Sequence, residues 1–490
     1  MHAGVSRIDI TPPIGIGMVG YYIREGVSTG IERPLTATAL VLTDGETKIV
    51  IVACDIAFIQ NPAATDVRQK IAAAVGTRAE CVLLNYSHTH CGPTLPGFLF
   101  QEEDQRQLQA SYLVNLKAQL TGVAAAANSN LQPVRVGSGS GSVNIGINRR
   151  EKDENGKAFL GENPDGPMDP EVSVIRIDHL DGGRPLAVLY SHGCHTVTMG
   201  PKFLKLSPDF IGPAREHIET ATGALSLFLQ GAAGNINPAT GIGARADDSE
   251  NMHRLGTTLG AEVVKTMMQI RTHERRGPRV FLSSLAKVSL YPYVPVESGQ
   301  TDRIQVVTQS IDLPLLPLPS LEETKRILAD RTGKWEKAKA DNASPGVITV
   351  LRHFYDWAQL LHRTVEAGKK EVSIPLEVQA IRINDIAIVA VPGETLVELG
   401  LAVKKDSPFS KTVFLGYSNG CIGYISPADA YPRGGWSPWE TYAIPDMLFQ
   451  SYQLPMALTP ECGQMVVDCA LELSRRLAAD VTYRTASGRL

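Results

Sequence analysis

The segment TALVLTDGETKIVIVACDI, residues 38–56, decides the fold class of this chain. Two runs rich in β-branched and aliphatic residues flank Asp44 and Gly45, a pair that tolerates the positive φ angles of a tight turn, so the pattern predicts a β-hairpin. Residues 172–192 and 376–394 repeat this pattern around turns of their own. Repeated hairpins of buried strands predict a β-sheet core.

Helical apolar spacing and N-terminal caps predict four helices around this core. They lie at residues 105–127, 207–221, 247–270 and 460–479. Residues 320–370 add two charged helical stretches around a Ser-Pro-Gly break, preceded by the proline-rich run LPLLPLPS. We expect an α/β fold with a mixed β-sheet core, surrounding helices and a metal site at strand ends. One domain would cover residues 1–490, with a helical insertion or lid at about 313–370.

Composition and charge exclude several classes of protein. Hydrophobic residues make up 43% and charged residues 20%, which is ordinary globular usage, and the net charge of −4 gives no attraction to nucleic acid. No basic N-terminal region precedes an apolar stretch, and no window reaches the roughly 18 apolar residues of a membrane span. We therefore expect a cytoplasmic protein with no stable membrane anchoring. The sequence is also compatible with a homo-oligomer. Seven scattered cysteines, an odd number, favour reduced thiols.

Polar side chains follow the predicted strands at the points where the strands end. They are His88, His90, His192, His195, Glu394 and Tyr424. Ligands bind outside the carboxyl ends of strands in open α/β sheets, so we expect these residues to converge. On a strand, His88 and His90 would point to one face and could contact one metal ion. Alone, such a pair of histidines is more typical of a hydrogen-bonded strand end. Together with a carboxylate, the histidines fit a catalytic zinc site, which keeps one coordination position open for water.

Six motifs in register resemble those of the neutral/alkaline ceramidase family, over nearly the whole chain. They are SRIDITPP, SHTHCGP, HTVTM followed by SPDFIG, GAAGNINP, the PGE of VAVPGETL, and NGCIGYISPADAY. The resemblance implies an amidase in which one zinc ion per chain activates water to cut an N-acyl bond. Zinc lowers the pKa of bound water to about 7 and can polarise an acyl carbonyl.

The resemblance also implies roles for individual residues. The zinc ligands would be His88, His195, Glu394 and Tyr424. His90 would contact the water or the substrate and move a proton, as an imidazole that titrates near neutral pH can. Arg149, in GINRRE, resembles an arginine that lines the active site of the family, although an exposed charge is the other interpretation. Tyr424 would be the most mobile ligand, because a phenol titrates near 10.

Two nearby residues have more than one interpretation. His192 has no counterpart in the family pattern, and we interpret it as structural or as a second layer around the ligands. Asp209, in SPDFIG, would orient a ligating imidazole, a role that metal sites usually fill. The competing interpretation is that Asp209 belongs to the start of the helix that follows.

The chain departs from the family pattern where substrate would bind. Asn237 replaces a serine of the family, and Trp436 replaces a tyrosine. We also expect no C-terminal immunoglobulin-like domain, because about 66 residues follow Tyr424 and end in a predicted helix. These departures favour a small soluble N-acyl or cyclic amide over ceramide as substrate.

Three alternatives stay open at this point. A zinc-dependent esterase or lactonase would attack an acyl carbonyl with the same chemistry. A binding protein could keep the fold without catalysis, although the intact set of ligands argues against it. Ser87, Cys91 and Cys194 lie beside histidines and could be nucleophiles, but the GxSxG elbow of serine hydrolases is missing.

Overall fold

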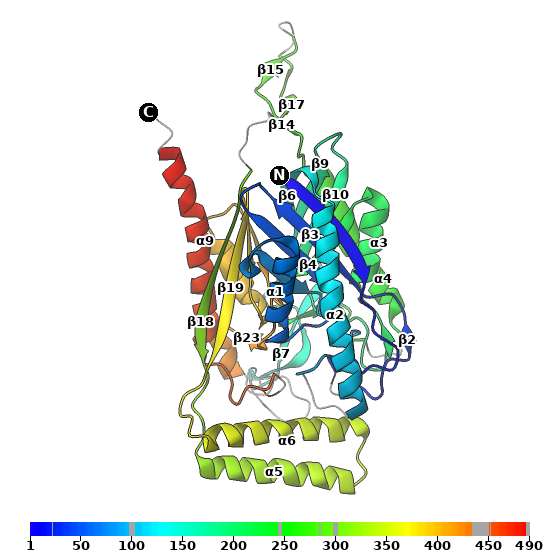
Figure 1. Cartoon of the computed structure of the whole chain (residues 1–490), viewed down its shortest axis with the longest axis vertical. Helices are drawn as coiled ribbons and strands as arrows, with labels where there is room; N and C mark the ends of the chain where they lie inside the picture. The colour runs from blue at the N-terminus through cyan, green and yellow to red at the C-terminus, as the bar shows by residue number, and fades with distance from the viewer. Residues whose placement is uncertain are drawn as a thin grey trace.

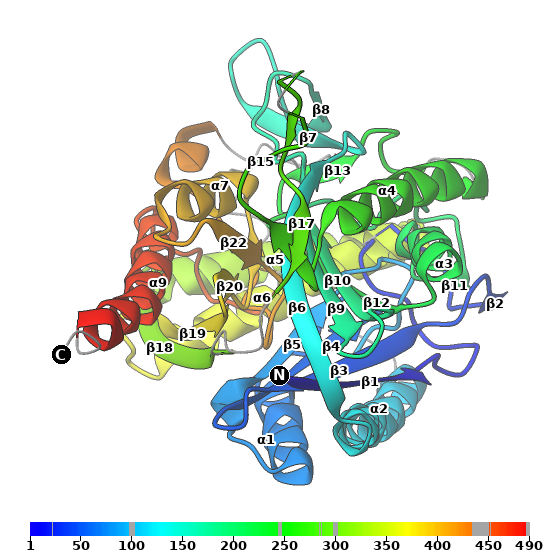
Figure 2. The ribbon, with the colours of Figure 1, turned by 90° about the horizontal axis from the view of Figure 1, so that it is seen from above.

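The computed structural model describes residues 1–21, 23–97, 103–243, 247–283, 285, 287–296, 302–433, 450 and 452–486. Helices surround a mixed β-sheet core, which confirms the predicted fold class. Four layers follow one another: a group of helices, an eight-stranded sheet, a four-stranded sheet, and a second group of helices (Figures 1 and 2).

The larger sheet has the strand order β12-β10-β9-β6-β1-β3-β4-β5. In chain order its strands are β1 (His2–Asp9), β3 (Thr36–Thr43), β4 (Lys48–Cys54), β5 (Val82–Tyr86), β6 (Gln132–Ser142), β9 (Glu171–His179), β10 (Pro185–His192) and β12 (Leu225–Gln230). The antiparallel pairs β3–β4 and β9–β10 confirm the first two predicted hairpins. β5 runs parallel to β4, and β12 runs parallel to β10.

The smaller sheet has the strand order β18-β19-β20-β22. Its strands are β18 (Ile304–Pro314), β19 (Ser373–Ile383), β20 (Ile386–Ala390) and β22 (Lys411–Leu415). The third predicted hairpin is the antiparallel pair β19–β20, which turns at Asn384 with a φ of 55°. Asparagine adopts this left-handed conformation more readily than most residues do, which explains the tight connection.

Alternation along the strands separates two cores. On β3, Ala39 and Val41 face a core shared with helices, whereas Leu40 and Leu42 face the smaller sheet. Successive side chains of a strand point to opposite faces, so a strand buried on both sides is apolar at every position. This explains why the predicted strands read as continuous apolar runs rather than as alternating ones.

Helices cover the outer face of each sheet. Over the larger sheet lie α1 (Ala63–Val75), α2 (Glu103–Ser129), α3 (Ile211–Thr222) and α4 (Ser249–Gln269), and over the smaller sheet lie α7 (Val397–Asp406) and α9 (Cys462–Ala486). The four predicted helices are confirmed as α2, α3, α4 and α9, whereas α1 and α7 were not predicted. α3 begins four residues later than predicted, because Asp209 has a φ of 57° and cannot be helical.

The predicted helical insertion is the pair α5 (Leu321–Ala340) and α6 (Pro345–Glu366). It lies between β18 and β19, which pair with each other up to Pro314 and Ser373. Ser320 and Glu323 form a capping box at the start of α5. Trp357 and Leu361 of α6 pack on Leu454 and Ala457, so the pair covers one end of the molecule (Figure 1).

Short elements complete the fold. They are β2 (Gly30–Ile31), β7 (Gly146–Lys152), β8 (Ala158–Asn163), β11 (Lys205–Leu206), β13 (Ile236–Pro238), β14 (Glu274–Arg276), β15 (Val280–Phe281), β16 (Ser289–Leu290), β17 (Tyr293–Pro295), β21 (Glu394–Thr395), β23 (Tyr424–Ile425), and the 3₁₀ turns η1 (Ala79–Cys81) and η2 (Ala428–Arg433). Among the described residues, none of the helices combines the length and apolar character needed to span a bilayer.

Candidate metal centre

Buried asparagines join the two sheets just ahead of the first histidine pair. Asn85, in β5, donates through Nδ2 to Gly416 O and Ser418 Oγ, both at 3.0 Å. Asn419 Oδ1 accepts from Leu84 N at 2.9 Å. Buried backbone groups require such partners, so these bonds fix the end of β5 against the loop that follows β22.

His88 does not lie on a strand. β5 ends at Tyr86, and His88 has a φ of 61°, in the left-handed region that few non-glycine residues adopt. The expectation that strand alternation would place His88 and His90 on one face is therefore wrong. A tight loop brings the two rings together instead, with His90 Nε2 at 3.2 Å from His88 Nε2.

The predicted convergence of histidines from distant segments is found. Ligand nitrogens of His88, His90 and His195 all lie within 4.8 Å of one another. Glu394, which opens β21, places Oε2 at 3.3 Å from His88 Nε2 and at 3.2 Å from His195 Nε2. His195 is fully buried and Glu394 is 1% exposed, so water cannot solvate these polar atoms freely.

Backbone carbonyls settle which ring nitrogens carry protons. His88 Nδ1 donates to Ala57 O at 3.3 Å, and His195 Nδ1 donates to Ala233 O at 2.6 Å. A carbonyl oxygen only accepts, so each ring carries a proton on Nδ1, and in the neutral form of each ring Nε2 presents a lone pair. In that form the two lone pairs would meet the carboxylate of Glu394 with no proton among the three atoms. Such an arrangement fits a bound cation, and two imidazoles with a carboxylate are typical zinc ligands.

The charge states agree with this interpretation. Burial, and then the nearby charge of Arg149, lower the pKa of His195 to about 3, so its imidazole is neutral. Burial alone would raise the pKa of Glu394, but its contacts with His88 and His195 more than offset this and hold the pKa well below 4.5. His195 therefore contributes a neutral imidazole, and Glu394 contributes an ionised carboxylate.

Arg149 connects the cluster to two further predicted residues. Its guanidinium donates to Tyr424 OH at 2.9 Å, to Asn237 Oδ1 at 3.0 Å and to Gly234 O at 2.6 Å. Arg149 is 4% exposed, which excludes the alternative of a solvent-exposed charge. β21 and β23 pair in parallel with Glu394 opposite Tyr424, so this ladder places the phenol beside the carboxylate. Burial and the charge of Glu394 raise the pKa of Tyr424 well above 10.

His90 lies at the edge of the cluster, against His88. Burial, followed by the neighbouring imidazoles, lowers the pKa of His90 well below 6.5. The Tyr21 ring packs edge-on against it at 5.0 Å between centroids. Gly20, with a φ of 103°, allows this approach, because a Cβ there would come within 2.3 Å of the imidazole.

Comparison with known proteins identifies the family. Residues 1–266, more than half of the chain, match the family described as neutral/alkaline non-lysosomal ceramidase, N-terminal. The chain belongs to this ceramidase family. The matched region contains both predicted histidine ligands and Arg149, whereas Glu394 and Tyr424 lie beyond it.

Solved structures share the fold of this ceramidase family member. Neutral ceramidase from Pseudomonas aeruginosa superposes with a TM-score of 0.64 at 20% identity, over 97% of this chain and 74% of that one. A ceramidase complexed with C2 superposes with a TM-score of 0.67 at 18% identity, over 98% of this chain and 75% of that one. The similarity extends over both sheets, well past the residues that the family match covers.

Two tyrosines of the site were not predicted from the sequence. Tyr417 OH donates to Glu394 Oε2 at 3.3 Å, and its ring lies 4.5 Å from that of His88. Tyr452 OH donates to the other carboxylate oxygen, Oε1. Tyr417 lies two residues before the motif NGCIGYISPADAY, which begins at Asn419, so its position offered a weak signal. Tyr452 lies in no motif, and only the packing of the segment beneath α6 brings it to the site.

Other predicted residues lie outside the cluster. His192 Nδ1 donates to Glu171 O at 3.0 Å, and among the described residues His192 is not part of the histidine group that could hold a metal ion. Asp209 accepts from Met199 N and Phe210 N at 3.0 Å and 2.6 Å. Its predicted role in orienting an imidazole is wrong, because backbone carbonyls orient both candidate ligands. Trp436 lies outside the described residues.

The cysteine and serine nucleophiles lose support in this ceramidase family member. All seven cysteines are free and buried, as expected for reduced thiols. Burial raises the pKa values of Cys91 and Cys194 well above their usual range, so both stay protonated and weakly nucleophilic. Ser87 Oγ is buried and has no hydrogen-bond partner among the described residues, so no base activates it.

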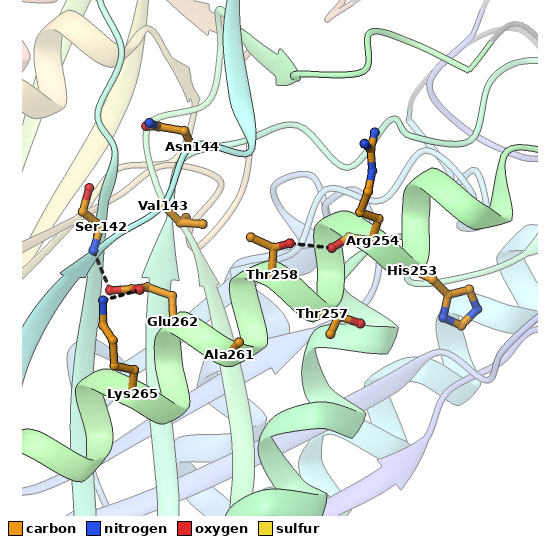
Figure 3. Close-up of a pocket in the computed structure, with 10 residues that line it drawn as sticks. All are labelled: Ser142, Val143, Asn144, His253, Arg254, Thr257, Thr258, Ala261, Glu262 and Lys265. Carbon is orange, nitrogen blue, oxygen red and sulfur yellow. Dashed lines mark hydrogen bonds and ion pairs between the residues drawn. The ribbon is translucent and has the colours of Figure 1, made fainter.

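A cavity of about 820 Å³ lies between the end of β6 and α4 (Figure 3). None of the candidate ligands lines it. Glu262 occupies one side, where Oε1 accepts from Ser142 N at 2.8 Å and Oε2 pairs with Lys265 Nζ at 2.6 Å. Glu262 and Lys265 thus partly neutralise each other, and we assign the cavity no catalytic role.

Proposed function

We propose that this protein is a zinc-dependent hydrolase that cleaves an amide bond in a small molecule. The observation that carries the proposal is that His88 Nε2 and His195 Nε2 lie 3.3 Å and 3.2 Å from Glu394 Oε2, while each ring donates its Nδ1 proton to a backbone carbonyl. Neutral rings held in this way would direct two buried lone pairs at a buried carboxylate, an arrangement that a bound cation stabilises. Membership in the ceramidase family supports amide bonds as the target.

Four residues would hold the zinc ion: His88, His195, Glu394 and Tyr424. When bound, zinc supplies a Lewis acid that acidifies a water molecule and polarises an acyl carbonyl. The two carbonyls behind the imidazoles fix the ring orientations, and such partners also raise ligand basicity. Tyr417 and Tyr452 hold the two oxygens of Glu394, so the carboxylate cannot rotate freely.

The remaining groups would act on the substrate. We assign His90 to proton transfer rather than to the ligand set, and this is supported by its contact with His88 Nε2 at 3.2 Å, whereas the histidine contacts of Glu394 Oε2 are with His88 and His195. From there it would accept a proton from the attacking water and return it to the departing amine nitrogen. Arg149 holds Tyr424 OH at 2.9 Å, so its guanidinium would steady the phenol and stabilise negative charge that develops on the acyl oxygen.

The proposal extends to substrate and setting. A small soluble N-acyl or cyclic amide fits the departures at Asn237 and Trp436 better than ceramide does. Asn237 Oδ1 accepts from Arg149 at 3.0 Å, so it would tune a group that touches substrate. We propose a single domain with a cytoplasmic location, in keeping with the composition and the buried, free cysteines.

The test combines metal removal with a matched substrate panel. The purified protein is assayed on N-acyl amides and on esters with the same acyl and leaving groups, before chelation, after chelation, and after zinc is returned. We expect amide hydrolysis that disappears on chelation and recovers with zinc. Faster turnover of every ester would favour the esterase alternative. Activity that survives complete removal of metal would refute a zinc-dependent mechanism.

A further inference from the structure

Arg24 is a half-buried arginine beside the candidate metal centre that the mechanism above does not use. Its Nε and Nη2 atoms are buried, and neither has a hydrogen-bond partner in the part of the chain that the structure describes. No described carboxylate lies within ion-pair distance of it. A buried guanidinium without a partner is costly, because its desolvation is not offset.

Local contacts hold this guanidinium in a fixed orientation. Arg24 N donates to Tyr21 O at 3.2 Å, closing a tight turn, and Nη1 donates to Val19 O at 2.7 Å. The guanidinium carbon lies 4.8 Å from the centroid of the Tyr21 ring. Tyr21 is itself held by a 2.8 Å hydrogen bond from its hydroxyl to Met199 O. The side chain is therefore positioned in advance of any ligand.

The unused nitrogens form one edge of the guanidinium. With Nη1 committed to Val19, the Nε and Nη2 atoms present two parallel N–H groups along that edge. This fork matches the two oxygens of a carboxylate, which is the pairing that arginine recognises most specifically. A neutral amide or hydroxyl could satisfy only part of the fork and none of its charge.

The position of Arg24 links it to the reacting centre. The Tyr21 ring contacts both the guanidinium and His90: its centroid lies 4.8 Å from the guanidinium carbon and 5.0 Å from the centroid of the His90 ring. Gly20 allows the whole turn to lie directly on the imidazole. An anionic group held by Arg24 would thus sit next to the residue that we assign to proton transfer.

The start of α6 adds to the attraction for an anion. Gly346, in the first turn, is buried against Ile23, since a Cβ at 346 would come within 3.3 Å of Ile23 Cα. The Ser344 side chain makes no capping hydrogen bond, and no acidic residue lies in the first turn. The first turn of α6 therefore supplies no acidic side chain and no capping hydrogen bond to offset the positive end of the helix dipole.

From these contacts we propose that Arg24 binds a carboxylate on the substrate, so that the protein acts on amides that carry a free carboxylate, such as N-acyl amino acids. The inference rests on the proposed function for the reaction but not for the binding of the ligand. It also gives a physical reason to prefer such substrates over ceramide, which is uncharged and would leave the guanidinium buried without a partner.

The test compares one pair of ligands across four proteins. An N-acyl amino acid and its primary carboxamide, which differ only in charge, are titrated by calorimetry and assayed for hydrolysis. The proteins are the wild type, Arg24→Gln, Arg24→Lys, and Arg254→Gln as a control that removes an exposed arginine. Zinc content and thermal unfolding are measured on each preparation, so that a folding defect is recognised.

We expect the wild type to favour the carboxylate, and Arg24→Gln to lose this preference by roughly 30-fold or more, as for a truncated buried charge pair. Arg24→Lys should recover only part of it, because an ammonium lacks the fork. Arg254→Gln should match the wild type. Equal affinity of the wild type for both ligands, or an unchanged preference in Arg24→Gln, would overturn the inference.

Binding and turnover separate this inference from the proposed function. Binding of the carboxylate that depends on Arg24, without hydrolysis of either compound, would support the role of Arg24 and refute the amidase. Hydrolysis of the neutral amide with no preference for the carboxylate would support the amidase and refute the role of Arg24. If the wild type neither binds nor hydrolyses the carboxylate compound, the inference about Arg24 is overturned. If Arg24→Gln does not fold, the preference of Arg24→Lys decides the matter.

Discussion

His195 Nε2 lies 3.2 Å from Glu394 Oε2, with no proton to share between them. The proton of His195 is on Nδ1, where it is donated to Ala233 O, and the carboxyl of Glu394 is ionised. His88 Nε2 approaches the same oxygen at 3.3 Å. We propose that a bound cation, which all three atoms would ligate, explains why two imidazole nitrogens approach one carboxylate oxygen.

Replacing Glu394 with glutamine should weaken zinc binding and hydrolysis together. The change keeps the shape of the side chain but removes the one full negative charge that faces the two imidazoles. We expect a loss of at least about 100-fold in zinc affinity, larger than is typical for residues behind the ligands. Competition with a chelator of known affinity measures it. Unchanged zinc affinity in Glu394→Gln would place the metal elsewhere.

Replacing His90 with alanine should separate metal binding from chemistry. If His90 moves a proton and is not a ligand, His90→Ala should keep its zinc and lose about 10²- to 10⁴-fold in turnover. Zinc content and kcat are measured on one preparation. A variant that loses its zinc, and whose activity returns on adding zinc, would instead show that His90 is a ligand.

Removing the Tyr452 hydroxyl should loosen Glu394 without removing a ligand. Tyr452→Phe deletes the donor to Oε1, and loss of such a partner typically costs 10- to 100-fold in metal affinity. Tyr431→Phe is a matched control, because its hydroxyl bonds to Leu458 O and Thr459 O and does not contact Glu394. Equal zinc affinity in the two variants would show that Tyr452 has no role at the site.

The fold could be predicted from the sequence more completely than the geometry of the site could. Turn pairs such as Asp44 and Gly45 are local signals, so three hairpins and the α5–α6 insertion could be predicted. α1 and α7 could not, because their apolar faces are defined by packing on the sheets. The ligand candidates came from motifs, and they do converge. How they converge depends on the left-handed φ of His88, which no sequence period encodes.

Tertiary contacts explain the remaining errors. Tyr452 reaches Glu394 only because Leu454 and Ala457 pack against α6. Asp209 was expected to orient an imidazole, since carboxylates often do, but the carbonyl of Ala233 reaches His195 first. Backbone groups are the same in every residue, so a sequence gives no sign of which carbonyl will act as a ligand partner.

His353 should make folding depend on pH below neutrality. Burial lowers the pKa of His353 to about 4 in the folded state, whereas an unfolded histidine titrates near 6.5. The unfolded chain therefore binds the extra proton first as the pH falls. Stability is fully present above about 6.5 and decreases toward pH 4, by up to about 1.4 kcal/mol per pH unit from this group.

The measurement is the free energy of unfolding in urea at several pH values between 7.5 and 5. His353→Gln should show a shallower decrease than the wild type. His362→Gln, which changes a histidine of the same helix that bonds to Thr324, serves as the control and should keep the steep decrease. Parallel curves for the wild type and His353→Gln would contradict the assignment to His353.

We expect His195, with His88 and Glu394, to hold a metal ion. The zinc content per chain is measured for the purified wild type, for His195→Ala, and for His192→Ala, which removes a buried histidine three residues away that lies outside the candidate metal group. The wild type and His192→Ala should contain close to one zinc per chain, and His195→Ala should have a nearly empty site. Full zinc content in His195→Ala, or equal loss in both variants, would contradict this expectation.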